Sequence, residues 1–209
     1  MLIRQVSTVA LAAVLVASVA GAGQTGTKRS APDEYTGTTA NLTPGSDNPI
    51  SIQVLKWSSK ADRERVLSAI RSVSKEEGRQ QDLTRQLAEV PTAGYIWTGG
   101  PVGYAIKYAC RVSQPDSGEH IVLVTDRPLG ILERSGSWKA TGQESEADPF
   151  TIVELHLNKS GTGNNKMSLG VPFSVNDAEQ TLSLSNYEHA AVMLGEIEHK
   201  PKPYWAKVQ

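Results

Sequence analysis

The chain contains a single cysteine, Cys110, so no disulfide can form within it. Without a disulfide, the fold must be held by its hydrophobic core. The chain also lacks an excess of one charge, because 21 basic residues face 22 acidic ones. Proteins whose main partner is a nucleic acid usually carry a basic surface, so this balance argues against that class of partner.

Long hydrophobic runs occur in one place only, between Val6 and Val19. This run of about 14 residues is shorter than the roughly 20 that a membrane-spanning helix needs. It follows Arg4 and precedes Ala20-Gly21-Ala22, which together form the pattern of a secretory signal peptide. We therefore predict that residues 1–22 are a signal peptide, cleaved after Ala22, and that the mature chain has no transmembrane anchor and is periplasmic or secreted.

The mature chain is long enough for one domain with a substantial core. Residues 23–34 are polar, and we predict that they form a flexible leader. Residues 35–199 are expected to form the domain, and residues 200–209 are expected to form a tail rich in lysine and proline. Apolar residues recur at helical spacing within residues 60–90, where Gly78 and Pro91 are stop signals. A helical hairpin is therefore expected there, after the second strand.

Alternating apolar residues predict about nine strands around this hairpin. Nine expected strands cover residues 34–42, 49–57, 94–98, 103–112, 120–126, 150–158, 166–175, 180–186 and 190–199. Residues 130–134 are a candidate edge strand, and a polar loop covers residues 134–148. Short turns favour antiparallel pairing. The expected fold is mainly β, an antiparallel meander that closes into a barrel or forms a two-layer sandwich.

Two strands carry distinctive patterns. In residues 103–112, strict alternation would place Tyr104, Ile106, Tyr108, Cys110 and Val112 on one face, with Lys107 and Arg111 on the other. Residues 121–124 are apolar at adjacent positions, which indicates a strand that is buried on both faces.

These segments together resemble a family of small exported bacterial proteins of unassigned function. The resemblance rests on "GYIWT" followed by "GYAIKYA", on "HIVLVTDRPLG", and on "FTIVELHLN" before the glycine-rich "GTGNN". It spans most of residues 35–197. It implies export and this fold, and it implies no activity.

An acid lies next to a base at Asp126 and Arg127, where an apolar strand ends. The pair could serve general acid–base chemistry or bind a ligand. However, Pro128 ends the ladder, and adjacent strand residues point to opposite faces, so the two side chains should not meet. We predict a structural role, with Asp126 bonded to its own turn and Arg127 paired with Glu133 or Glu154.

Glu154 and His156 share one strand face, and two such ligands could begin a zinc or copper site. The third ligand would have to be His120, His189 or His199. An exposed polar face explains the pair more simply, so we predict no metal and no cofactor. Cys110 is expected to be a buried thiol and not a nucleophile, because its strand face is apolar.

Four aromatic residues gather on neighbouring segments: Tyr95, Trp97, Tyr104 and Tyr108. In a sheet that closes incompletely they would line a ligand cavity, and in one that closes fully they would be core. The preferred function is a non-catalytic binding module for a small or apolar ligand. The alternatives are a hydrolase that uses Asp126 with Arg127 or Glu154 with His156, and a structural partner in the cell envelope.

Export gives the first testable prediction. Mass spectrometry of the protein recovered from the periplasm or medium should find Gly23 at the amino terminus, because the peptidase recognises the small residues Ala20 and Ala22. A chain that retains Met1 and sediments with membranes would contradict it.

Overall fold

The computed structural model describes residues 31–40, 42–43, 48–73, 80–115, 117–130, 138–140, 149–160, 162–168, 173–184 and 191–200. Within these residues, no helix is long and apolar enough to cross a membrane. The elements, in chain order, are β1 (Asp33–Ala40), β2 (Leu42–Thr43), β3 (Pro49–Val54), α1 (Lys60–Val73), α2 (Gln80–Glu89), β4 (Gly94–Trp97), β5 (Tyr104–Ser113), β6 (Glu119–Thr125), β7 (Lys139–Ala140), β8 (Ile152–Leu157), β9 (Asn165–Ser168), β10 (Phe173–Asn176), β11 (Thr181–Leu184) and β12 (Ala191–Lys200).

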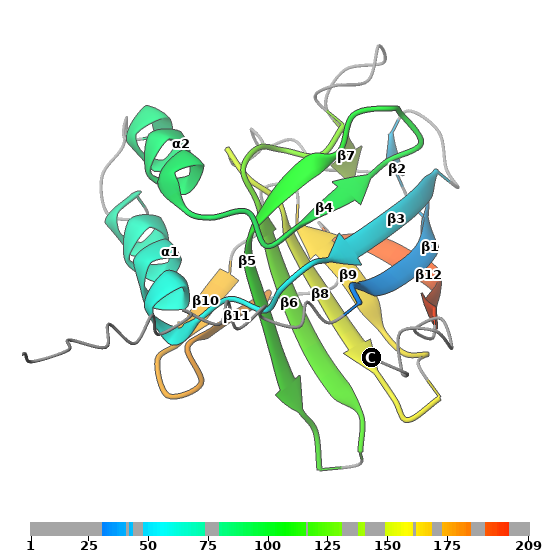
Figure 1. The fold of residues 1–209 in the computed structure, drawn as a ribbon. Helices are drawn as coiled ribbons and strands as arrows, with labels where there is room; N and C mark the ends of the chain where they lie inside the picture. Colours follow the sequence, from blue (N-terminus) through cyan, green and yellow to red (C-terminus); the bar gives the residue numbers. More distant parts are fainter. Residues whose placement is uncertain are drawn as a thin grey trace, which may run out of the picture.

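Eight strands form a closed antiparallel barrel in the order β1-β12-β9-β8-β6-β5-β4-β3 (Figure 1). The barrel closes at β1, where Tyr35 lies opposite Ile52 of β3 on one side and His199 of β12 on the other. Closure removes the unpaired strand edges that an open sheet would expose. The mainly β prediction is confirmed, with a barrel rather than a sandwich.

The barrel interior is filled by an inner core of apolar side chains. Tyr35, Ile52, Tyr104, Leu123 and Leu155 are all at most 1% exposed and belong to one cluster. An eight-stranded barrel is just wide enough for side chains to fill it. The inward-facing residues of this barrel therefore serve packing.

A second, outer core lies outside the barrel wall made by β5, β6 and β8. Helical residues of α1 and α2, including Leu67 and Leu87, pack there with Val122 and Val124 of β6. Figure 1 shows both helices and the β10–β11 hairpin on this side of the barrel. Because Leu123 faces the inner core, β6 is buried on both faces, as its apolar sequence predicts.

The helical hairpin follows β3, the second strand of the barrel, as predicted. Ser59 caps α1, since its hydroxyl accepts a hydrogen bond from the Asp62 N–H at 3.1 Å. Pro91 follows α2 and Val90. The bounds expected from helical spacing, residues 60–90, contain both helices.

The predicted single face of β5 is wrong, because a bulge interrupts the strand between Ile106 and Tyr108. Tyr104 and Ile106 point into the inner core, whereas Tyr108 and Cys110 point into the outer core. One extra residue in a bulge reverses the alternation of every side chain that follows it. Cys110 is 1% exposed, as expected for a buried thiol.

The same bulge directs Lys107 toward the end of α2. Its ammonium donates to the Val90 carbonyl at 3.0 Å, to the Ala88 carbonyl at 3.4 Å and to the Thr92 hydroxyl at 3.3 Å. Carbonyls at a helix carboxyl end lack helical partners and carry partial negative charge. Lys107 is only 7% exposed and therefore acts as a buried cap on α2.

The carboxyl-terminal third differs from the prediction. Residues 166–175 form parts of two strands, β9 in the barrel and β10 outside it, and β11 pairs with β10 instead of continuing the meander. Gly170 and Pro172 lie between β9 and β10, and proline cannot donate to a ladder.

The loop expected over residues 134–148 contains the short β7, which pairs with β2. The strand expected at 130–134 lies almost wholly outside the described residues.

The cap on α2 gives a prediction. Lys107→Met should lower the free energy of unfolding by about 1–2 kcal/mol, because it leaves two carbonyls near the helix end without their cationic donor. Urea denaturation measures the change. Lys56→Met, at an exposed lysine, is the matched control and should change stability by less than about 0.5 kcal/mol. Equal effects from the two variants would contradict the capping role.

Candidate functional site

The turn after β6 inserts an apolar residue into the barrel. Leu129 is fully buried in the inner core, and its N–H donates to the Thr151 hydroxyl at 3.0 Å. The Thr125 hydroxyl donates to the Arg127 carbonyl at 2.7 Å and accepts from the Thr151 N–H at 2.9 Å. Gly130 has a φ of 83°, and a Cβ there would lie 2.3 Å from the Trp138 ring, so only glycine fits.

Asp126 and Arg127 do meet, contrary to the expectation from strand alternation. Arg127 donates through Nε to Asp126 Oδ1 at 3.1 Å and through Nη2 to Oδ2 at 2.9 Å. These hydrogen bonds, and the charge of Asp126, raise the pKa of Arg127. The two side chains can meet because β6 ends at Thr125, so that Asp126 and Arg127 lie in a turn where strand alternation does not apply.

The expected partners of this pair also need correction. Glu154 contacts histidines and not Arg127, and Glu133 lies outside the described residues. The Arg127 side chain is 49% exposed, so its ion pair with Asp126 is a surface contact. The structural interpretation of this turn is supported by Thr125, Leu129 and Gly130 more than by the charged pair.

The four candidate aromatic residues do not line one cavity. Tyr104 lies in the inner core, and Tyr108 lies in the outer core, where its hydroxyl donates to the Gln180 carbonyl at 2.6 Å. Tyr95 is 36% exposed and stacks obliquely on Trp97, with 5.7 Å between ring centroids. Trp97 lines a surface hollow of about 300 Å³ together with Gly99 and Gly100.

The barrel end at which β1 begins is held by polar contacts around Trp57. Its indole N–H donates to Asp33 at 3.1 Å, and the Arg111 guanidinium lies 4.7 Å above its ring. Arg111 also pairs with Glu119 at 3.4 Å. Burial raises the pKa of the nearby Tyr35 phenol. These contacts fix Trp57 against the inner core.

A buried carboxylate lies on the outward face of β8. Glu154 is only 1% exposed, so the prediction of an exposed polar pair was wrong for this residue. The β10–β11 hairpin covers it, and this layer was not expected from the sequence. A buried carboxylate needs compensating partners, because removing a charge from water is costly.

Two histidines supply part of that compensation. His120 Nε2 lies 2.8 Å and His156 Nε2 lies 3.0 Å from the same oxygen, Glu154 Oε1. His120 and His156 are direct cross-strand partners on β6 and β8, and their rings stack with centroids 4.2 Å apart. The His120 side chain is 10% exposed, whereas that of His156 is 43% exposed.

Glu154 also ties the β10–β11 hairpin to the barrel. Its Oε2 accepts the Leu184 N–H at 3.2 Å, and its Oε1 lies 3.4 Å from the Ser183 hydroxyl, which donates to it. The hairpin is held elsewhere by Gln180, which donates to Glu64 at 2.8 Å, and by an ion pair of Asp177 with Arg71. One carboxylate therefore joins the two histidines to the outer layer.

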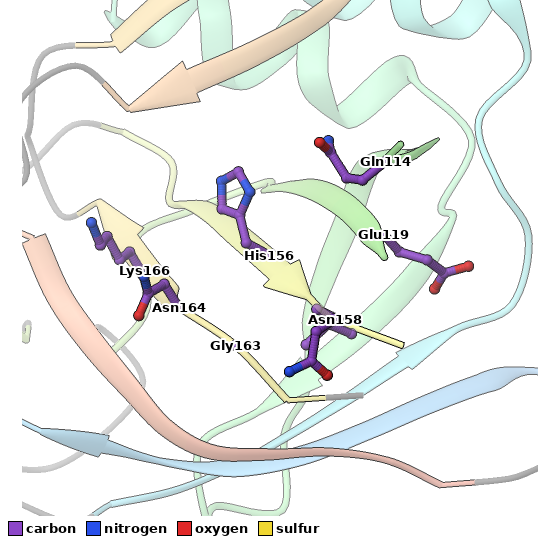
Figure 2. A pocket seen from close by; sticks show the side chains of 8 residues that line it. Gln114, Glu119, His156, Asn158, Gly163, Asn164 and Lys166 are labelled. Carbon is purple, nitrogen blue, oxygen red and sulfur yellow. The ribbon is translucent and has the colours of Figure 1, made fainter. Parts of the chain in front are cut away.

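A polar hollow of about 410 Å³ adjoins this cluster (Figure 2). Figure 2 shows His156 and Lys166 projecting from the adjacent strands β8 and β9 toward the same side. Among the residues that the structure describes, the lining comprises Gln114, Glu119, His156, Leu157, Asn158, Gly163, Asn164 and Lys166. His156 is thus shared between the buried cluster and the hollow.

Lys166 provides the cationic side of the hollow. It lies opposite Glu154 in the β8–β9 ladder. Burial lowers the pKa of Lys166, and the attraction of Glu154 only partly opposes this effect. An ammonium group that is short of solvation gains more from a bound anion than a fully hydrated one does.

The sequence revealed part of this arrangement. Alternation places Glu154 and His156 on one face, and His120 is one of the three possible third ligands. The sequence alone could not distinguish His120 from His199 as the third residue, because only the register of β6 against β8 places His120 beside Glu154. His199 lies near Asp33 instead. His189 lies outside the described residues. Lys166 and Ser183 were not found, because no local pattern connects β9 or β11 to Glu154.

No protein-family model, no curated protein and no solved structure matches this chain. The family resemblance and the hydrolase alternative therefore stay predictions.

The turn after β6 gives a prediction that separates its hydroxyl from its charged pair. Thr125→Val should lower the free energy of unfolding by about 1–3 kcal/mol, because it leaves the buried Thr151 N–H without its acceptor. Asp126→Ala should cost only about 0.2–1 kcal/mol, since its partner is half exposed. Urea denaturation of both variants is the measurement. A larger loss from Asp126→Ala than from Thr125→Val would contradict this ranking.

Proposed function

We propose that this protein is an exported, non-catalytic binding module that holds a small polar molecule bearing an anionic group in the hollow between His156 and Lys166. Export is supported by the secretory pattern of residues 1–22. Binding is supported by the convergence of polar side chains from the β5–β6 and β8–β9 hairpins around one hollow.

The inner core does not provide this site. Its residues pack against one another across the barrel, and Leu129 is fully buried among them. The surface hollow has a volume of about 410 Å³, within the range of about 300–1,000 Å³ that is typical of small-molecule pockets. A ligand of modest size would therefore bind at the wall and not inside the barrel.

The charges of the lining favour one anionic group over several. Lys166 offers an ammonium with reduced solvation, and the amides of Gln114 and Asn164 can donate hydrogen bonds. Glu119 lies on the same lining and is paired with Arg111 at 3.4 Å. A carboxylate or phosphate group near Lys166, with a neutral or donor group toward Glu119, suits this distribution.

An apolar ligand is the second candidate, supported by the hollow beside Trp97. Gly100 leaves open space there, because a Cβ at this position would have no atom within 4 Å. Trp97 supplies the aromatic part of its lining, and the Tyr95 ring lies beside Trp97, tilted by 43°. This hollow of about 300 Å³ keeps the sequence-based prediction of an apolar ligand open.

Binding is tested by NMR titration of the EDTA-treated, isotopically labelled protein with small monocarboxylates, phosphate monoesters, inorganic phosphate and an uncharged indole. We expect a carboxylate or phosphate monoester to shift the backbone signals of Asn164, Lys166 and Gln114. Lys166→Met should weaken binding at least fivefold, because it removes the cation. Lys159→Met, at an exposed lysine of the same hairpin, should leave it unchanged.

Three outcomes would contradict the proposal. The first is no binding by any of these probes, and the second is equal affinity in the two lysine variants. The third is binding of indole alone with shifts at Tyr95 and Trp97, which would favour the apolar site.

A further inference from the structure

We infer that His120, Glu154 and His156 form a binding site for a divalent transition-metal ion of the zinc class. The site lies on the outward face of the barrel wall, where the outer core ends. It is distinct in chemistry from the anion-binding hollow, although His156 borders both. The inference therefore goes beyond the proposed function and does not depend on it.

The spacing of the donor atoms suits one ion. One ligand atom from each of the three residues can be chosen so that all lie within 4.8 Å of one another. Donor atoms around a tetrahedral zinc ion lie about 3.3 Å apart, given bonds of about 2.0–2.2 Å. The two nitrogen-to-oxygen distances, 2.8 and 3.0 Å, are close to this value. Because the two imidazoles are stacked with their centroids 4.2 Å apart, their side chains would have to rotate to direct both Nε2 lone pairs at one ion.

The donor types select the kind of metal. Two imidazole nitrogens and one carboxylate oxygen suit zinc, cobalt, nickel or copper ions. Magnesium and calcium prefer ligand sets made wholly of oxygen atoms, so they should bind poorly here. Three protein ligands also leave at least one coordination position for water or another molecule.

The barrel wall brings the three ligands together before any metal arrives. His120 and His156 lie directly opposite each other in the β6–β8 ladder, and Glu154 is two residues from His156 on the same strand face. The Leu184 N–H, which donates to Glu154 Oε2 at 3.2 Å, fixes the second carboxylate oxygen. Partners of this kind orient metal ligands and increase affinity for the ion.

Access is provided by one of the ligands. His120 and Glu154 are buried, but His156 is 43% exposed and lines the polar hollow. An ion can therefore reach the cluster from solvent through the hollow. A hydrogen-bond network with only a structural role would show no selective affinity for transition metals. A measurement of metal affinity therefore distinguishes a metal site from such a network.

The test uses the untagged full-length protein after EDTA treatment and dialysis. Isothermal titration calorimetry with zinc chloride should show one ion bound per chain, and magnesium chloride should give no binding at the same concentrations. Cobalt(II) should produce visible absorption bands from imidazole and carboxylate ligation. Zinc should also raise the melting temperature of the wild-type protein.

Two histidine variants and a control locate the ion. His156→Ala and His120→Ala should each weaken zinc binding at least tenfold. His199→Ala, which removes another imidazole far from the site in sequence, should leave the affinity unchanged. Because His156 is partly exposed, the His156→Ala variant should stay folded. It therefore tests the assignment even when the His120→Ala variant does not fold.

Zinc binding that persists in His156→Ala, or that is lost equally in His199→Ala, would overturn the assignment. Wild-type protein that binds zinc no better than magnesium would also overturn it. Lys166→Met should still bind zinc, at least as tightly as the wild type, because it removes no ligand and takes a positive charge away from Glu154. A failure of metal binding and a failure of anion binding are therefore distinguishable.

Discussion

The structure depends on burial of the β5–β6–β8 wall on both of its faces. Inside, this wall completes the barrel, and outside it supports α1, α2 and the β10–β11 hairpin. A strand covered on both faces must be apolar at adjacent positions, as β6 is from Ile121 to Val124. Where the cover ends, outward positions on the same strands are free to be polar. His120 and His156 occupy those positions, so the candidate site marks the border of the outer core.

Glu154 connects the polar residues at this border, because its carboxylate contacts both histidines and the β10–β11 hairpin. It is covered as fully as its apolar neighbours, yet it carries a carboxylate. Its oxygens accept hydrogen bonds from the backbone of β11 and from Ser183, and both histidines contact it. The outer hairpin and the histidine pair are thus coupled through one side chain. Both histidines and the Ser183 hydroxyl of the hairpin share the same carboxylate oxygen, Glu154 Oε1.

Local patterns in the sequence predicted the parts of the fold that local chemistry decides. The helical spacing of Val66, Leu67 and Ile70, the cap at Ser59 and the double-faced burial of β6 all follow from nearby residues. The bulge after Ile106 has no such signal, and it reassigns Tyr108 and Cys110 to the outer core. Likewise, the contact of His120 with Glu154 depends on the pairing of β6 with β8, and the burial of Glu154 depends on a hairpin from a later part of the chain. Long-range register is therefore what the sequence pattern could not supply.

Metal binding by His120, Glu154 and His156 is the function proposed for the polar border of this wall. The most direct measurement is X-ray diffraction from zinc-soaked crystals, recorded on both sides of the zinc absorption edge. We expect one strong anomalous peak within about 2.0–2.2 Å of a nitrogen from each histidine and of an oxygen of Glu154. A map without a peak at these residues, with Glu154 still hydrogen-bonded to both imidazoles, would contradict it.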